Sequence, residues 1–270
     1  MLFNPYELKN TVLRNRIVMA PMTRSMSPGG VPTQAVIDYY ERRAKAEVGL
    51  IITEGIEVSH KASSAYPDVP RLDSEEARNA WKKVVTAIKK HDGAVVAQLW
   101  HCGGFRKLGM APEPEVPGHT ASGLVRPGKK VAHEMTIQDI NETIQAFASD
   151  AKFCEEIGFD GVEIHGAHGY LIDNFFWNGT NVREDMYGGS TAERSQLATE
   201  IVKAIRSEVS SNFIVGLRFS QWKQQDYEAR LASTPEELKT VLTPPAEAGL
   251  DYLHSSMRRF WDSEFSGSEE

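Results

Sequence analysis

Val162-Glu163-Ile164-His165-Gly166-Ala167-His168-Gly169-Tyr170 is the stretch that decides how this chain is read. The short run Val162–Ile164 predicts a buried strand, and the glycines after it predict a loop with a sharp turn. Two imidazoles and a phenol therefore follow the end of a strand, which is where α/β barrels place their chemistry. Histidines can donate hydrogen bonds to a polarised oxygen, and a tyrosine can deliver a proton. Any one of these residues alone would favour a structural loop with satisfied polar groups.

Apolar and amphipathic runs alternate outward from this segment, which is typical of βαβ units. The expected strands are Ile17–Ala20, Leu50–Thr53, Val95–Leu99, Val162–Ile164, Ile214–Arg218 and Tyr252–His254. The expected helices are Thr33–Ala46, Glu75–His91, Ile137–Ile157, Ala192–Val209 and Pro235–Ala248. The sequence therefore predicts an α/β fold, a (β/α) barrel of the TIM type, as a single domain over residues 1–270. A closed barrel of this type has eight strands, so about two βα units are missing from the pattern.

Glycine and proline mark the expected boundaries. Four glycines fall between a predicted helix and the next predicted strand, where a left-handed cap favours glycine: Gly49, Gly93, Gly158 and Gly249. Thr234-Pro235 places a capping hydroxyl and a proline at the start of the last helix. Pro244-Pro245 predicts that this helix breaks and restarts near Pro244, since an interior proline costs about 3 kcal/mol or more.

Composition narrows the class of protein. The net charge of -7 argues against nucleic acid or an anionic membrane as a partner. We find no signal peptide and no stretch that approaches the roughly 18 apolar residues of a membrane helix. We therefore expect a cytoplasmic protein that acts on a small molecule, and a homo-oligomer is compatible with the sequence.

Five blocks, in this order along the chain, resemble the Old Yellow Enzyme family of NADH:flavin oxidoreductases, which are FMN-dependent ene-reductases. The blocks are Asn15–Arg24, Gln98–His101, His165–Tyr170, Asn181–Ser190 and Gly216–Arg218. The resemblance covers nearly the whole chain. It implies FMN as cofactor, NADH or NADPH as reductant, and hydride transfer to the activated C=C bond of α,β-unsaturated carbonyl or nitro compounds.

The resemblance also implies two overlapping sets of site residues. Those expected to bind the flavin are Pro21, Met22, Thr23, Gly55, Gln98, His165 and Arg218. Those expected to bind substrate are Trp100, His165, His168 and Tyr170. Of these, His165 and His168 would hold the substrate oxygen and Tyr170 would protonate the alkene carbon opposite the hydride, which makes these three the expected catalytic residues. A tyrosine that anchors a loop by its hydroxyl is the competing interpretation for Tyr170.

Relative to the family, the chain is expected to be incomplete at its C-terminal end. Such barrels usually hold a ligand's phosphate on the loops after strands seven and eight, and the FMN phosphate of the family lies there too. This chain offers no equivalent residues. A second hypothesis is therefore a truncated, catalytically impaired barrel fragment or interaction module that does not hold FMN.

Other chemistries receive less support. Glu163, His165 and His168 could bind a metal, but the intervening glycine favours a loop over the helix face that this histidine spacing suits, so we expect no metal ion. No nucleophile elbow supports a Ser-His-Asp hydrolase. No Gly-x-Gly-x-x-Gly motif or P-loop supports a Rossmann domain or an NTPase.

Overall fold

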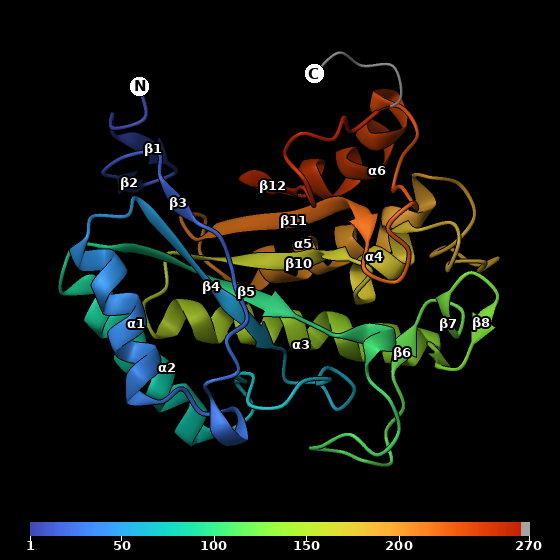
Figure 1. Ribbon diagram of the computed structural model, residues 1–270, viewed down its shortest axis with the longest axis horizontal. Helices are drawn as coiled ribbons and strands as arrows, with labels where there is room; N and C mark the ends of the chain where they lie inside the picture. The colour runs from blue at the N-terminus through green and yellow to red at the C-terminus, as the bar shows by residue number, and fades with distance from the viewer. Residues whose placement is uncertain (266–270) are drawn as a thin grey trace.

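One six-stranded parallel sheet organises the computed structural model, which describes residues 1–265. Its strand order is β12-β11-β10-β5-β4-β3. The strands are β3 (Val18–Met19), β4 (Leu50–Glu57), β5 (Ala94–Trp100), β10 (Gly161–His168), β11 (Ile214–Lys223) and β12 (Tyr252–Ser256). The sheet curves, but within the described residues its two outer strands, β3 and β12, do not pair with each other. The sheet therefore forms an open part of a barrel (Figure 1). The predicted α/β class and the six predicted strands are confirmed.

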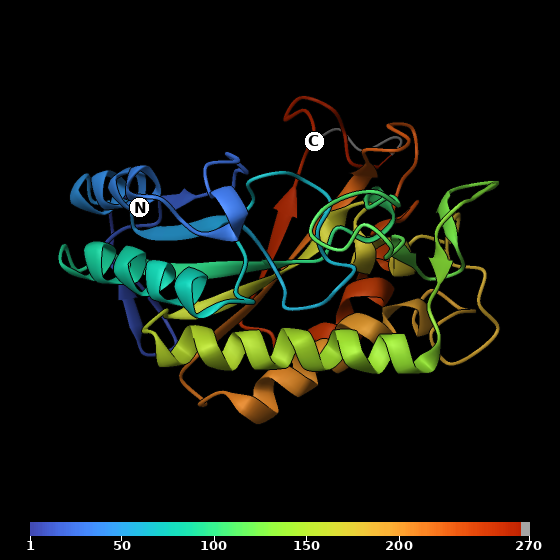
Figure 2. The same cartoon turned by 90° about the horizontal axis from the view of Figure 1, so that it is seen from below.

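Helices cover the outer face of the sheet, where α1 packs on α2, α3 on α5 and α5 on α6 (Figure 2). The α-helices are α1 (Gln34–Lys45), α2 (Glu75–Lys89), α3 (Ile137–Glu156), α4 (Leu171–Phe176), α5 (Gln196–Glu208) and α6 (Pro235–Glu247). The 3₁₀ turns are η1 (Pro28–Gly30), η2 (Gly103–Phe105) and η3 (Glu193–Ser195). Strands β4 and β5 are buried along their whole length, so the main core lies between sheet and helices. Among residues 1–265 no helix has the length and apolar character that crossing a membrane requires.

The glycine junctions are confirmed only in part. Gly158 and Gly249 have the positive φ of a left-handed cap, whereas Gly49 and Gly93 do not. Near the first junction the left-handed residue is Glu47, with φ 62°. Gly49 is needed for a different reason, because a Cβ there would lie 2.2 Å from the carbonyl oxygen of Asn15. The chain thus uses glycine at this junction for close backbone approach rather than for backbone conformation.

The prediction that the last helix breaks at its two prolines is wrong. Helix α6 runs through Pro244 and Pro245. Pro245 has no N–H for the carbonyl of Val241, four residues earlier. The hydroxyl of Ser195 donates to that carbonyl instead, at 2.7 Å, from the neighbouring turn η3. A tertiary hydrogen bond therefore replaces the missing helical one, which lets the helix continue.

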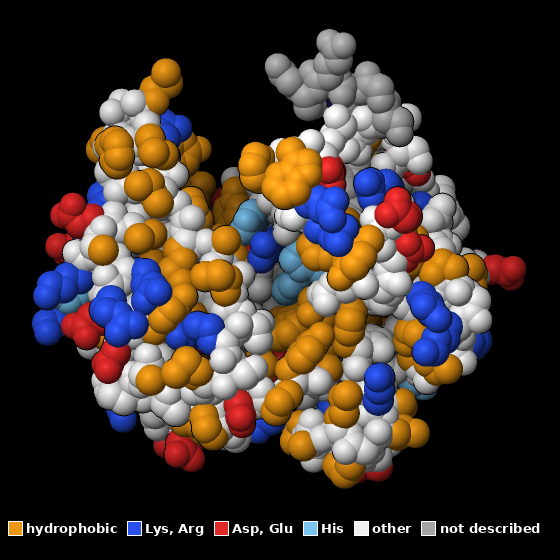
Figure 3. Space-filling model, viewed as in Figure 1, with side chains coloured by type: hydrophobic (Ala, Val, Ile, Leu, Met, Phe, Trp, Pro, Cys, Tyr) orange, Lys and Arg blue, Asp and Glu red, His pale blue; other side chains and the backbone are white. Residues whose placement is uncertain are grey.

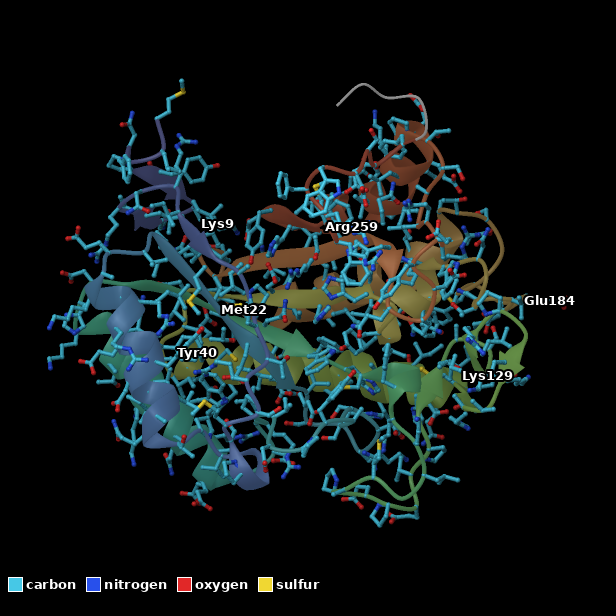
Figure 4. All side chains as sticks on the ribbon, viewed as in Figure 1. Lys9, Met22, Tyr40, Lys129, Glu184 and Arg259 are labelled. Carbon is cyan, nitrogen blue, oxygen red and sulfur yellow. The ribbon has the colours of Figure 1, made fainter. Side chains whose placement is uncertain are left out.

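The chain leaves the sheet in two further regions. A hairpin of β1 (Tyr6–Leu8) and β2 (Thr11–Leu13) precedes β3. The excursion after β5 contains β6 (His119–Thr120), β7 (Leu124–Arg126), β8 (Lys129–Lys130) and β9 (His133–Glu134). Lys129 on β8 stands at the outer end of this excursion, far from Tyr40 on α1 (Figure 4).

Arg106 holds the first part of this excursion in shape. Its side chain is buried, and its guanidinium donates hydrogen bonds to backbone carbonyls of the surrounding loops. The acceptors are the carbonyls of Ser64, Met110, Ala111, Glu113 and Val116. Arg106 is thus a scaffold for the loop, since its donors are used up on backbone oxygens.

Candidate functional site

Strand β10 contains the first seven residues of the segment Val162–Tyr170. The strand is longer than predicted. The strand continues to His168, so the expected loop after Ile164 is wrong. Gly166 allows this, because a Cβ there would lie 2.8 Å from Cδ1 of Leu217 on the paired strand β11. The pairing with β11 shifts register between Gly166 and His168, and His168 has a φ of 66°. A bulge of this kind re-aims a side chain, and here it turns His168.

The two histidines of β10 lie beside each other. Their ring centroids are 5.2 Å apart and their planes are nearly perpendicular. The His165 ring stacks on Trp100 at 5.9 Å, and the His168 ring stacks on Trp222 at 4.6 Å. Nε2 of His168 lies 2.7 Å from Oγ of Ser256, which is on β12.

Both rings are uncharged at neutral pH. Burial lowers the pKa of His165 well below its usual range, and the neighbouring His168 adds to this effect. Burial, followed by the charge of Arg218, lowers the pKa of His168 to about 3. A neutral imidazole still carries one N–H donor, so each ring can donate one hydrogen bond without bearing a charge.

Tyr170 completes this group at the N-terminal end of α4, where it is the capping residue. Its ring contacts Trp100, His165 and Phe105, with centroids 4.9, 5.0 and 4.6 Å away. Its hydroxyl lies 3.2 Å from that of Tyr66. Burial raises the pKa of Tyr170, so the hydroxyl keeps its proton. Sequence reasoning missed Tyr66, because it sits in an irregular segment after β4 with no motif around it.

A buried ion pair fixes the turn between His168 and Tyr170. Nζ of Lys223 lies 2.6 Å from Oδ1 of Asp173, and neither side chain is exposed. The other carboxylate oxygen of Asp173 accepts the backbone N–H of Gly169 at 2.6 Å. The turn is therefore held by charge-assisted bonds inside the protein, which are among the stronger polar contacts available.

Glu163 lies two residues before His165 on β10, so both side chains point to the same face of the sheet. Its buried carboxylate accepts from Nε2 of Gln98 at 2.8 Å and from the hydroxyl of Tyr252 at 3.1 Å. Nδ1 of His254 lies 2.8 Å from the same carboxylate. These three partners occupy the oxygens that a metal at Glu163 would need.

Arg218 lies beside this carboxylate on β11, paired in register with His165. Its Nη2 donates to Oγ of Ser256 at 3.1 Å, while its Nε is buried without a hydrogen-bond partner. Burial lowers the pKa of Arg218, and the charge of Glu163 opposes that effect. A buried N–H donor on a half-buried cation is costly to leave unpaired, which makes this end of the sheet suited to a ligand with acceptor atoms.

The residues after the first strand of the sheet are placed less deeply. Pro21 is buried, whereas Met22 and Thr23 are exposed. On β4, a Cβ at Gly55 would lie 2.6 Å from Cε3 of Trp100, so that tryptophan alone requires glycine at this position.

A cavity of about 400 Å³ follows the open side of the barrel. One wall comes from β3 and β4, with Val18 and Ile52, and the other from β12, with Tyr252 and His254. Figure 3 shows this side as a hollow between two parts of the molecule, with histidine and basic side chains on its walls. The hollow joins the partners of Glu163 to solvent.

Comparison with known proteins gives the chain its family. A family model described as "NADH:flavin oxidoreductase / NADH oxidase family" matches residues 1–261. The chain is 37% identical over 264 residues to 12-oxophytodienoate reductase 2 of Arabidopsis thaliana, covering 94% of this chain and 69% of that protein. It is 36% identical over 223 residues to 12-oxophytodienoate reductase 7 of Oryza sativa subsp. japonica, covering 78% of this chain and 56% of that one.

A solved structure supports the same assignment. The crystal structure of Old Yellow Enzyme from Pichia sp. AKU4542 superposes with a TM-score of 0.84 at 28% identity, covering 96% of this chain and 71% of the other. The chain therefore spans between 56 and 71% of the length of these three relatives. Its six strands correspond to part of a TIM barrel, and the chain belongs to the NADH:flavin oxidoreductase family, of which Old Yellow Enzyme is a member.

Proposed function

We propose that this chain is an FMN-dependent oxidoreductase that transfers hydride from NADH or NADPH to the activated C=C bond of α,β-unsaturated carbonyl or nitro compounds in the cytoplasm. The observation that carries the proposal is the group at the end of β10. Two neutral histidines and a protonated tyrosine meet there around Trp100. Family membership supplies the class of chemistry.

The residues of the barrel interior fit the ring of a flavin. FMN, when bound, supplies the acceptor and donor of hydride. Arg218 would stabilise negative charge on the reduced ring, and its free Nε is available for that bond. Gln98 and His165 would hydrogen-bond the ring, while Pro21, Met22 and Thr23 would lie against it after β3. Gly55 leaves room beside Trp100 on the neighbouring strand.

His165 and His168 would bind the oxygen of the substrate. Their rings converge at 5.2 Å, close enough for both N–H groups to reach one oxygen atom. Such donors, fixed before substrate arrives, stabilise the negative charge that develops on oxygen during hydride addition. Because both rings are neutral, the site provides hydrogen bonds without giving away a proton.

Tyr170 would supply the proton. Its hydroxyl is protonated and buried among aromatic rings, and Trp100 and Tyr66 form the wall next to it. The hydroxyl of Tyr66, 3.2 Å away, orients that of Tyr170. This contact also supports the alternative in which Tyr170 is only a structural anchor, so the two roles need an experiment.

The experiment combines a spectrum with one hydroxyl deletion. The purified chain should be yellow or become so on addition of FMN, and it should reduce a cyclic enone with NADPH. Tyr170→Phe should lower turnover about 10²–10⁴-fold, because general acids of this kind contribute that much. Tyr187→Phe is the matched control, since its hydroxyl also makes one hydrogen bond, to Glu200 at 2.6 Å, on the outer side of the barrel. Unchanged turnover in Tyr170→Phe would refute the proton-donor role.

A second candidate follows from the coverage of the relatives. The chain matches 56% of one relative and 69% of another, and within residues 1–265 the two outer strands of the sheet, β3 and β12, do not pair with each other. A barrel fragment that does not hold FMN, or an interaction module, would share these features. A colourless protein that remains free of flavin after addition of FMN would favour this candidate over the enzyme.

A further inference from the structure

Four more histidines form a row outside the hollow. Nδ1 of His60 lies 3.1 Å from Nε2 of His101, and the rings of His60 and His119 are 5.4 Å apart. The rings of His119 and His133 are 4.8 Å apart, and Nε2 of His133 lies 2.8 Å from Oδ2 of Asp139. The row thus runs from the end of β5 to the first turn of α3 and ends on a carboxylate.

Two nitrogens in this row are buried without a partner. Nδ1 of His119 and Nε2 of His60 accept or donate no hydrogen bond among residues 1–265, and His119 is only 3% exposed. An orphaned polar atom inside a protein is uncommon and calls for a partner that is missing from the chain itself.

The far end of the row has the spacing of a metal site. One ligand atom from each of His119, His133 and Asp139 can be chosen so that all three lie within 4.8 Å of one another. Oδ2 of Asp139 already accepts from Thr136 through both its N–H and its hydroxyl. Among the described residues no hydrogen bond ends on Oδ1, which leaves that oxygen for another partner.

We propose that His119, His133 and Asp139 bind a divalent transition-metal ion of the Zn²⁺ type, with water in the fourth position. Two imidazole nitrogens and one carboxylate oxygen suit zinc, whereas Mg²⁺ and Ca²⁺ prefer oxygen ligands alone. The ion would displace the hydrogen bond between His133 and Asp139. To bind the ion through Nε2, His133 would change tautomer. The proton on Nε2 would move to Nδ1, which leaves a lone pair on Nε2 for the ion.

A metal ion at this site would cross-link the excursion after β5 to helix α3. His119 lies on β6 and His133 on β9, which pair with each other and so close the base of the β7–β8 hairpin. Asp139 belongs to the first turn of α3. A bound ion would tie both strands at the base of the hairpin to this helix. The hairpin in turn forms, with Tyr66 and Phe105, a second cavity of about 420 Å³, so the ion would stiffen that wall.

Metal titration tests the proposal independently of the flavin reaction. The chain, purified without a histidine tag and stripped with a chelator, is titrated with Zn²⁺ by calorimetry and with Co²⁺ by visible absorption. We expect one ion per chain, a rise in Tm on binding, and the d–d absorption of low-coordinate Co²⁺. His119→Gln and Asp139→Asn should each lower the affinity about 100-fold or more, since even residues that only orient metal ligands contribute 10–100-fold.

Two controls make the outcome decisive. His91→Gln removes a half-buried histidine that pairs with Glu41 at 3.2 Å. His91 precedes β5, whereas His101 of the row follows that strand, so this change should leave metal affinity unchanged. Asp139→Asn keeps a side-chain oxygen that can accept the backbone N–H of Thr136, the N-cap residue of α3, so it serves if His119→Gln fails to fold. Absence of stoichiometric binding, binding that survives both ligand substitutions, or binding lost in His91→Gln would each overturn the proposal.

Discussion

The pair His165 and His168 and the row formed by the other four clustered histidines differ in the side chains that their rings contact. His165 packs on Trp100 and His168 on Trp222, and Ser256 joins His168 to Arg218. In the row, His60 and His119 face other imidazoles, and the row ends on Asp139. Burial lowers the pKa of His165 and His168 in the first group, and of His60, His101 and His119 in the row. Under the two proposals, the same type of side chain would donate to a substrate oxygen in one setting and bind a cation in the other.

The supports of the two groups differ as well. His165 and His168 lie on a central strand, and the turn after them is fixed by Asp173 and Lys223. The row is carried by loops and by strands of two residues, such as β6 and β9. Reactive groups work best on rigid elements, whereas a metal site can gain its order from the ion itself. We expect the first group to be ordered before any ligand binds and the second to tighten on binding.

Breaking the support of the first group should give the largest effect. Lys223→Met leaves Asp173 as a buried charge without its partner, so the free energy of unfolding should fall by about 3–5 kcal/mol in urea titrations. The additional change Asp173→Leu should recover much of this loss. Lys152→Met is the control, because its pair with Glu208 is exposed and should matter little. A Lys223→Met variant as stable as the original chain would mean that the turn is held by other contacts.

Substituting one histidine in each group should lower the turnover rate by very different factors. His165→Ala removes one donor to the substrate oxygen, and turnover of a cyclic enone should fall about 10²–10³-fold in steady-state assays with FMN present. His60→Ala, in the row, should cost much less, since its ring does not face the hollow. Equal losses in the two variants would show that the distinction between the groups is wrong.

Lowering the pH should reduce the free energy of unfolding through the buried histidines of the row. The pKa of His60 and of His119 is about 4 in the folded chain and about 6.5 when unfolded. Below pH 6.5 the unfolded chain therefore binds protons that the folded chain does not, so the free energy of unfolding falls as the pH drops from 6.5 towards 4. Each histidine contributes up to about 1.4 kcal/mol per pH unit in that window.

Urea titrations at pH 7 and pH 5.5, with a chelator present, measure this effect. His119→Gln should be less sensitive to the pH change than the original chain, and His165→Gln should behave in the same direction because the pKa of His165 is lowered too. A stability that does not change between these two pH values would contradict the assigned burial.

The smallest expected difference is between two flavins. The residues proposed to contact the flavin ring lie within residues 1–265, whereas the sequence offers no counterpart to the phosphate-binding residues that the family resemblance leads us to expect. FMN and riboflavin should therefore bind the 270-residue chain with affinities within about tenfold of each other in fluorescence titrations. His165→Ala should weaken both alike, and His119→Ala should weaken neither. A larger preference for FMN would reveal a phosphate site in the chain or in a second copy.

The sequence predicted the sheet and five of the helices well, because alternating apolar runs and glycine or proline boundaries are local signals. It missed α4, whose six residues are all buried and so show no amphipathic period. His165, His168 and Tyr170 could be picked out from the sequence because they lie within six residues of one another, and the structure brings their rings together. Their contacts with Tyr66, Trp222 and Ser256 could not be found, since these come from separate strands and loops.

The row of histidines escaped prediction for the same reason. Its members come from segments separated by tens of residues, and no spacing rule links them. The proline pair failed differently. A local rule ended α6 at Pro244, but the hydroxyl of Ser195 supplied a donor that the local sequence does not contain. In both cases the decisive partner lies far away along the chain.

The bond from Ser195 to Val241 also sets an order of events during folding. The C-terminal half of α6 has no helical donor for the Val241 carbonyl, so this half gains its full hydrogen bonding only after it docks on η3 and α5. We expect α6 to join a structure that has already formed rather than to nucleate it. Ser195→Ala should then accelerate unfolding while leaving the refolding rate nearly unchanged, the signature of a contact made after the rate-limiting barrier.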